Sequence, residues 1–403
     1  MRAFFFGLLV AAVVGWWAGV FGGAKGAADT ANAASANAAS GAPLTPTGAP
    51  LDRVLGIEAT ESVPPPPAVP ASGRVEEPPP PVLAELLPRL LQRDATAFAA
   101  GWGVLAKASL AVADRQQVTN ALAPTGDDFP TLLTALGANN MFLHSAEGRG
   151  LATKVATAAF SLADAEAVPA GTKLLELMAR GRILKADAAP YGLVSEVYKQ
   201  HLVRVDRWLC DPANVTGARS HTIGKGETLS GIATKFRKEK ILVEEGSLAI
   251  LNRIHNANLV KEGQKIRVPV APIHAVVEKR SFTMAVYVGE NLLRLYWIGH
   301  GENDRTPNAT FTIGVKQPRP QWTSPDGQVY GYGDAKNILG EYFIKFLNDT
   351  YIGFGAHGTT MPDTIRTMSS MGCIRMLDPD IAELFRLLPM GAKVEVRATE
   401  SLR

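Results

Sequence analysis

The chain has little of several features that often define a function. Its 403 residues include two cysteines, Cys210 and Cys373, which are too few for a disulfide scaffold. Seven histidines are scattered without the spacing of metal ligands, so we expect no metal and no cofactor. The net charge is +3, so global charge gives no reason to expect a nucleic acid partner. Cys210 and Cys373 could still pair with each other, which would leave no free thiol.

The first 24 residues are almost entirely apolar. From Ala3 to Ala24 there is no charged residue over 24 − 3 + 1 = 22 positions, and a helix that crosses a bilayer needs about 20. Arg2 supplies the positive flank expected on the cytoplasmic side. The sequence therefore predicts a membrane anchor at 1–24. A signal peptide cleaved near 31–33 is the alternative, and both export the chain to the cell envelope or periplasm.

The next two segments differ sharply in composition. Residues 25–81 are rich in Ala, Gly, Ser, Asn and Pro, which predicts a disordered linker. From residue 82, leucines recur at three- and four-residue steps, as amphipathic helices require. We predict an all-α region over 82–211, with breaks at 124–126, near 169–171 and at Pro190. The sequence indicates no role for this region.

A small module follows at residues 219–269. Its pattern predicts a strand, a glycine-containing turn, two helices and a final strand. The segments 221–229 and 263–269 resemble the opening and the ending of LysM domains, a family that binds N-acetylglucosamine-containing glycans such as peptidoglycan. This resemblance implies a βααβ fold with a glycan groove between its two end loops. The expected groove residues are Gly226, Glu227, Thr228, Leu229, Ile254, His255 and Asn256.

Residues 273–397 change to a period of two. Apolar residues alternate over 282–288 and 293–297, which predicts a hairpin. Many short strands at close spacing predict a mainly antiparallel β-sandwich. The remaining elements are a helix near 378–388 and strands near 310–316, 328–332, 342–347, 351–356 and 393–397.

One stretch of this domain carries the candidate chemistry. His357 precedes Cys373 by 373 − 357 = 16 positions, Gly372 comes directly before the cysteine, and Arg375 follows it. An imidazole can take the proton of a nearby thiol and keep the sulfur charged near neutral pH. The amides of Gly372 and Cys373 could face a developing oxyanion, and Arg375 offers a donor fork suited to a carboxylate. On spacing alone, a structural cysteine and an unrelated histidine remain the alternative.

The full motif favours chemistry. The strings His-Gly-Thr at 357–359 and Ser-x-Gly-Cys-Ile-Arg-Met at 370–376 resemble the active-site signature of L,D-transpeptidase catalytic domains of the YkuD type. The resemblance covers about 273–397, including Thr306-Pro307, and implies that family's fold. Met371 and Ala309 depart from the usual pattern, which often has histidine and glycine there. The implied site residues are the nucleophile Cys373, its base His357, and Gly372, Arg375 and Ser370 around them, with Asn337 and Gly358 on the substrate side.

Both resemblances together predict an exported peptidoglycan L,D-transpeptidase. Cys373 would form a thioester with a donor stem peptide, and the side-chain amine of an acceptor stem would resolve it as a 3→3 cross-link. The LysM module would raise the local concentration of the wall polymer. Water, a free D-amino acid or a protein lysine remain alternative acceptors. A catalytically idle wall-binding scaffold is the alternative from another class, and Met371 is its support.

Overall fold

The computed structural model describes residues 83–399, apart from 93, 95, 96, 98, 99, 102, 103, 105–110, 122–128, 139 and 140. All described residues belong to one compact unit. The predicted anchor and the predicted linker lie outside the described residues. Within the part of the chain that the structure describes, no helix combines the length and the apolar character needed to cross a membrane.

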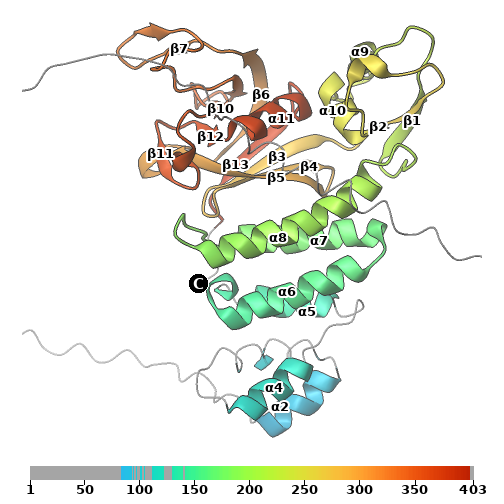
Figure 1. The fold of residues 1–403 in the computed structure, drawn as a ribbon, viewed down its shortest axis with the longest axis vertical. Helices are drawn as coiled ribbons and strands as arrows, with labels where there is room; N and C mark the ends of the chain where they lie inside the picture. Colours follow the sequence, from blue (N-terminus) through green and yellow to red (C-terminus); the bar gives the residue numbers. More distant parts are fainter. Residues whose placement is uncertain are drawn as a thin grey trace, which may run out of the picture. The chain divides into compact units, whose positions relative to one another are not determined.

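A helical region forms the first part of this unit (Figure 1). The helices α6, α7 and α8 contact one another, and the buried faces of α6 and α7 carry alanines that allow close approach. The described elements are α2 (Leu83–Leu91), α4 (Val112–Ala121), α5 (Phe129–Gly137), the 3-10 turn η2 (Phe142–His144), α6 (Ala146–Ser161), α7 (Asp164–Ala179), α8 (Ala188–Arg204) and the π-helical turn η3 (Val205–Leu209).

Two predicted helix breaks are wrong. Helix α7 continues through Pro169 although proline cannot donate a backbone hydrogen bond. Its neighbours Val168 and Ala170 are buried, so packing outweighs the lost bond. Pro190 lies in the first turn of α8, where a missing amide costs little. The chain turns instead at 162–163 and over 180–187.

The LysM module has the predicted order of elements. Strands β1 and β2 pair antiparallel, from Ala218 opposite Pro269 to Thr222 opposite Lys265. Thr228 caps α9 by accepting a hydrogen bond from the Gly231 amide at 3.1 Å. The elements are β1 (Ala218–Thr222), α9 (Leu229–Lys238), α10 (Glu245–Leu251), the 3-10 turn η4 (Ala257–Leu259) and β2 (Lys265–Pro269).

The remaining residues build a nine-stranded sheet in the order β11-β5-β12-β10-β9-β6-β13-β3-β4. Its elements are β3 (Ile273–Glu278), β4 (Thr283–Val288), β5 (Asn291–Gly301), the 3-10 turn η5 (Glu302–Asp304), β6 (Ala309–Pro318), β9 (Tyr342–Leu347), β10 (Gly355–His357), the 3-10 turn η6 (Pro362–Thr364), β11 (Met368–Ser370), β12 (Ile374–Met376), α11 (Asp378–Leu387) and β13 (Lys393–Arg397). A separate pair, β7 (Trp322–Thr323) and β8 (Val329–Tyr330), stands apart from this sheet.

The predicted sandwich is not confirmed, because the sheet closes on itself. Strand β5 is 11 residues long and pairs with β4 along its first part and with β12 near its end. Because β4 is the last strand of the order and β5 stands near its start, their pairing closes the sheet, as in a barrel. Three of the pairings are parallel: β10 with β12, β13 with β3, and β11 with β5.

The helical region is fixed to this sheet. The first part of β5 lacks a neighbour on its β12 side, because β12 pairs only with Ile298 and Gly299. Side chains of α7 and α8 form hydrogen bonds with backbone groups along that edge of β5. The Thr172 hydroxyl accepts from the Leu292 amide at 3.0 Å, and the His201 ring bonds the Leu292 carbonyl at 2.8 Å. The Tyr198 hydroxyl accepts a hydrogen bond from the Leu295 amide at 2.9 Å.

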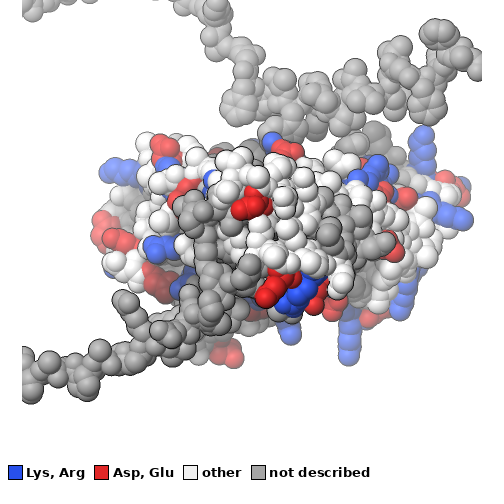
Figure 2. Space-filling model, turned by 90° about the horizontal axis from the view of Figure 1, so that it is seen from below, with Lys and Arg blue, Asp and Glu red and all other residues white. Residues whose placement is uncertain are grey.

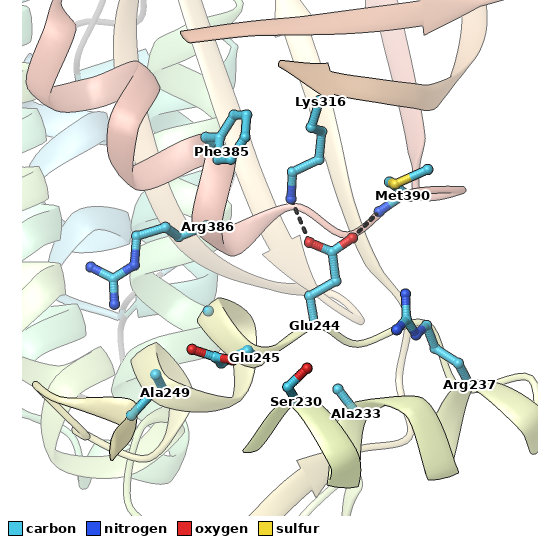
Figure 3. A pocket seen from close by; sticks show the side chains of 12 residues that line it. Ser230, Ala233, Arg237, Glu244, Glu245, Ala249, Lys316, Phe385, Arg386 and Met390 are labelled. Carbon is cyan, nitrogen blue, oxygen red and sulfur yellow. Dashed lines mark hydrogen bonds and ion pairs between the residues drawn. The ribbon is translucent and has the colours of Figure 1, made fainter. Parts of the chain in front are cut away.

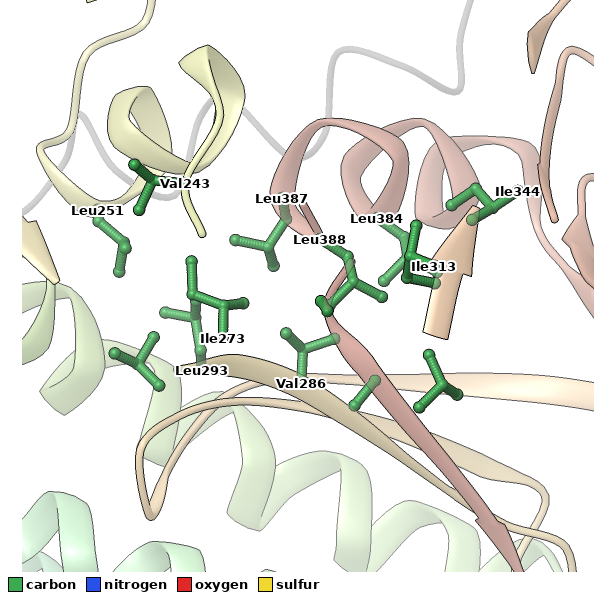
Figure 4. Packing of buried hydrophobic residues seen from close by; sticks show 14 of the residues in the cluster. Val243, Leu251, Ile273, Val286, Leu293, Ile313, Ile344, Leu384, Leu387 and Leu388 are labelled. Carbon is green, nitrogen blue, oxygen red and sulfur yellow. The ribbon is translucent and has the colours of Figure 1, made fainter. Parts of the chain in front are cut away.

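The module at residues 219–269 shares a core with the nine-stranded sheet. Val243 and Leu251 belong to the same buried cluster as Ile273, Leu387 and Leu388 (Figure 4). Helix α10 packs so closely on α11 that a Cβ on Gly246 would lie 2.4 Å from the Arg386 carbonyl oxygen. The module is therefore a packed part of the fold.

Surface charges contribute less to this packing. On the face shown in Figure 2, acidic and basic side chains are interspersed with uncharged surface. Ion pairs such as Arg89–Asp94 (3.2 Å) leave both side chains substantially exposed, at 47% and 40%. Such pairs are worth about 0–1 kcal/mol each, so stability depends mainly on the apolar cores.

Candidate functional site

The candidate base and the candidate nucleophile lie on two neighbouring chain segments, at the end of β10 and directly before β12. In the β10–β12 pairing, Ala356 lies opposite Ile374 and His357 lies opposite Arg375. Cys373 directly precedes β12, so it lies beside the strand that ends in His357. The sheet thus joins residues that are separated by 16 positions in the chain (373 − 357).

Cys373 is a free, partly exposed thiol. Its Sγ donates to the Gly353 carbonyl at 3.6 Å. Burial of the sulfur raises the pKa of Cys373 to about 11, although the Gly355 amide and Arg375 act in the opposite direction. Cys210 is also free and is buried after η3, so the alternative in which the two cysteines pair is wrong.

His357 is buried, with 2% of its surface exposed. Its Nδ1 lies 2.5 Å from the Gly358 carbonyl. A carbonyl can only accept, so Nδ1 carries the hydrogen and Nε2 of the neutral ring is left as a base. Burial lowers the pKa of His357 to about 4; the Gly358 bond opposes that shift and nearby Arg375 adds to it.

Burial does not favour the expected ion pair between Cys373 and His357. At neutral pH the lowered pKa of His357 and the raised pKa of Cys373 both favour uncharged groups. Desolvation is the first cause in each case, because a charged thiolate and a charged imidazolium both lose hydration in this site. The arrangement fits a neutral base that takes the thiol proton during attack.

The turn before Cys373 is closed by Ser370. Its hydroxyl accepts from the Gly372 amide at 3.1 Å and donates to the Cys373 carbonyl at 2.6 Å. Gly372 has φ +138, and an added Cβ would lie 2.8 Å from a ring carbon of Phe354, so only glycine fits. Because the Gly372 amide is already bonded, it is not available to an oxyanion in this geometry.

Thr306 is a site residue that sequence reasoning did not select. It is buried, and its hydroxyl donates to the Gly372 carbonyl at 2.7 Å while accepting from the Gly301 amide at 2.8 Å. It thereby ties the end of β5 to the turn that carries Cys373. The Thr306-Pro307 match to the family pattern was the available signal.

Arg375 is buried without an acidic partner. It is 7% exposed, and its Nη1 donates to Ser369 Oγ at 3.3 Å. Its Nε has no hydrogen-bond partner among the described residues, and no carboxylate there pairs with it. A buried guanidinium without a counter-charge is costly, so this position is suited to an incoming anion.

These features agree with matches to known families. The L,D-transpeptidase catalytic domain matches residues 272–396, and the LysM domain matches residues 221–269. A Bacillus subtilis protein assigned as L,D-transpeptidase YqjB is 30% identical over 124 residues, which cover 30% of this chain and 69% of that protein. The chain belongs to the L,D-transpeptidase family.

Other relatives cover different shares of this L,D-transpeptidase. A Bacillus licheniformis protein assigned as L,D-transpeptidase YkuD is 27% identical over 183 residues, covering 44% of this chain and 97% of that protein. More than half of the present chain thus has no counterpart there. The solved L,D-transpeptidase from Mycobacterium smegmatis overlaps with a TM-score of 0.27 at 20% identity, over 34% of this chain and 64% of that one. At that score the overlap adds nothing to the assignment.

In this L,D-transpeptidase, the helical region holds the loop that joins His357 to Cys373. Arg366 lies over the Tyr191 ring of α8, 4.3 Å from its centroid, and 5.3 Å from the Trp297 centroid. Its Nη2 donates to the Leu184 carbonyl, and Lys185 Nζ lies 3.6 Å from Asp363 Oδ1. Sequence reasoning missed these contacts, because they join segments about 180 residues apart.

Two predicted substrate-side residues have structural roles instead. An added Cβ on Gly358 would lie 2.1 Å from Asp378 Oδ1, so the position requires close packing. Asn337 is buried, and its Nδ2 donates to the carbonyls of Pro320, Tyr330 and Gly331 at 2.9–3.2 Å. Its Oδ1 accepts from the Leu339 amide, so both polar atoms of this side chain are hydrogen-bonded within the fold.

The first predicted loop of the LysM groove is mostly used by the module itself. Glu227 accepts from the Gly224 amide at 2.8 Å and bonds the His221 ring at 2.9 Å. Thr228 caps α9, and Leu229 is buried in the core. Gly226 is exposed at φ +77 and leaves its backbone open to a ligand.

The second predicted loop is more open. His255 is exposed, and Ile254 is half-buried and packs against the core. Asn256 Oδ1 accepts from the Asn258 amide at 3.0 Å and so caps the turn η4. The two loops therefore offer mainly backbone groups and an apolar edge. No group of three or more His, Cys, Asp or Glu residues within the described range is arranged to hold a metal ion.

A cleft of ≈ 390 Å³ lies between the LysM module and the catalytic domain (Figure 3). Helices α9 and α10 form one wall, and Lys316, Phe385, Arg386 and Met390 form the other. Neither Cys373 nor His357 lines it. It is therefore separate from the candidate catalytic site.

Proposed function

We propose that this L,D-transpeptidase joins peptidoglycan stem peptides through a thioester on Cys373. The placement of Cys373 directly before β12, next to the strand that ends in the buried His357, supports this proposal. His357 Nε2 accepts the thiol proton as Sγ attacks the carbonyl of the third residue of a donor stem. The bond to the terminal D-alanine breaks, and the departing amine takes the proton from the imidazolium.

The second half of the reaction reverses the proton transfer. The side-chain amine of an acceptor stem attacks the thioester and gives its proton to His357. The new amide is a 3→3 cross-link, and Sγ leaves as the thiol. With the Gly372 amide occupied, the Cys373 amide is the candidate donor to the oxyanion, a contact typically worth about 2.7–4 kcal/mol.

Arg375 supports recognition of the stem. Its buried guanidinium lacks an acidic partner among the described residues, and a stem carboxylate would supply one. Ser370 and Thr306 hold the turn around the nucleophile. No cofactor enters this chemistry.

The same proposal covers the organisation of the chain. The LysM match supports peptidoglycan binding and an extracellular or envelope location. We assign residues 82–211 to the helical region, 219–269 to the LysM module and 273–397 to the catalytic domain. The anchor over residues 3–24 stays a prediction from sequence.

Intact-protein mass spectrometry tests the chemistry. The full, reduced chain is incubated with a disaccharide-tetrapeptide, beside Cys373→Ala and the matched control Cys210→Ala. We expect a thioester adduct and D-alanine release from the wild type and the control, and neither from Cys373→Ala. Cross-linked dimer, tripeptide or exchanged tetrapeptide then identifies the acceptor. A folded wild type without adduct or turnover would refute the enzymatic proposal and favour the wall-binding scaffold.

A further inference from the structure

The cleft between the LysM module and the catalytic domain begins where the predicted glycan groove ends. Ser230 lines the cleft and follows Leu229 of the first groove loop. Ala257 also lines it and follows Asn256 of the second. A glycan strand bound between these loops would therefore reach the wall formed by the catalytic domain.

The two walls of the cleft are joined by partly buried polar contacts. Glu244 Oε2 accepts from Lys316 Nζ at 2.5 Å, and its Oε1 accepts from the Met390 amide at 2.8 Å (Figure 3). The Lys316 and Glu244 side chains are 7% and 20% exposed. These contacts and the close packing of Gly246 on Arg386 keep the cleft preformed.

Two arginines give the cleft its free positive charge. Arg237 and Arg386 are exposed and lie on opposite sides of the Glu244–Lys316 pair (Figure 3). Neither has an acidic partner among the described residues. Glu245 is exposed at the same cleft, so the two arginines outnumber the one carboxylate that is not in a pair.

We propose that this cleft binds carboxylates of the stem peptides on the glycan strand that the LysM module holds. Arg237 and Arg386 are the carboxylate contacts, because a guanidinium presents a fixed fork of donors to such groups. Half-buried Phe385 adds an apolar surface to the wall that carries Arg386. The inference rests on the proposed peptidoglycan recognition and extends it from the sugars to the peptides.

Binding to two polymers tests this site. The full chain, the double variant Arg237→Gln/Arg386→Gln and the surface control Lys173→Gln are each mixed with purified peptidoglycan and with neutral N-acetylglucosamine oligomers. The control removes one positive charge outside the cleft. Lys173 is exposed on α7, away from the cleft. We expect the double variant to bind peptidoglycan about five- to tenfold more weakly than the wild type, as the loss of two exposed charge contacts implies. Its binding to the neutral oligomers and the binding of the control should not change.

The outcomes separate this site from the function on which it rests. Equal binding of peptidoglycan by the wild type and a folded double variant would overturn the cleft and leave LysM recognition intact. An equal loss on both polymers would show an effect on the sugar groove, which also overturns the cleft. Failure of the wild type to bind either polymer would overturn the proposed recognition itself.

Discussion

Replacement of Arg366 should slow acylation of Cys373 although Arg366 does not contact the thiol. The residue holds the loop between His357 and Cys373 against the helical region. A cation over an aromatic ring is worth about 0.5–2 kcal/mol, and a hydrogen bond from a charged group about 1.5–3 kcal/mol. Because Arg366 is only half-buried, we take the lower part of the sum, about 2–3 kcal/mol, as the anchoring that Arg366→Ala loses.

That loss changes the balance between a docked and an undocked loop by about 30- to 150-fold. Arg366 has φ +63, and alanine keeps the same strained backbone, so the variant isolates the side-chain contacts. We expect faster amide exchange over 359–367 and at least tenfold slower thioester formation, with little change in the binding of peptidoglycan by the LysM module. Arg366→Lys should recover part of the rate, because it keeps the cation over Tyr191. Wild-type exchange and acylation in a folded Arg366→Ala protein would refute a positioning role for the helical region.

Three further predictions follow from buried or paired groups. Glu244→Gln should lower the free energy of unfolding by about 2–4 kcal/mol in urea titrations, because it leaves the nearly buried Lys316 without its counter-charge. The control Glu239→Gln breaks an exposed pair and should cost under about 1 kcal/mol. Equal costs would contradict a buried ion pair between the LysM module and the catalytic domain. Alkylation of Cys373 should be slow at pH 7 and rise about tenfold per pH unit toward its raised pKa of about 11. A rate that levels off just above about pH 9 would show an unperturbed thiol. Burial lowers the pKa of His201 to about 4, so below about pH 6.5 the unfolded chain binds a proton there and the folded chain does not. The free energy of unfolding should therefore fall by about 1.4 kcal/mol per pH unit between about pH 6.5 and pH 4. His201→Gln should make thermal melts less sensitive to acid, and no such change would mean that the His201 ring titrates normally.

Local patterns predicted the parts of the fold that depend on neighbouring residues. Alternation over 282–288 matches β4, and the leucine period from residue 83 matches α2. The motif around Cys373 indicated the residues that the sheet brings together. In each case the deciding residues are adjacent in sequence or belong to one motif.

The contacts that were missed join distant segments. Closure of the sheet depends on β5, which has different partners along its length, and no local pattern records that choice. Thr306 and Arg366 act through residues 66 and 182 positions away. Motif spacing carries no information on burial, so the pKa shifts of Cys373 and His357 could not be predicted from the sequence.

The shared core of the LysM module and the catalytic sheet changes what a wall-binding module can do here. A flexible tether would raise the concentration of stems all around the enzyme and leave their choice open. In this chain Glu244, Val243 and Leu251 pack directly on the catalytic domain, so linker length plays no part between the two. Under the proposed function, the fold would then fix the distance between the sugar bound by the LysM module and the stem peptide that reacts. Cross-links made by such an enzyme would recur at one offset along the strand from the point of attachment.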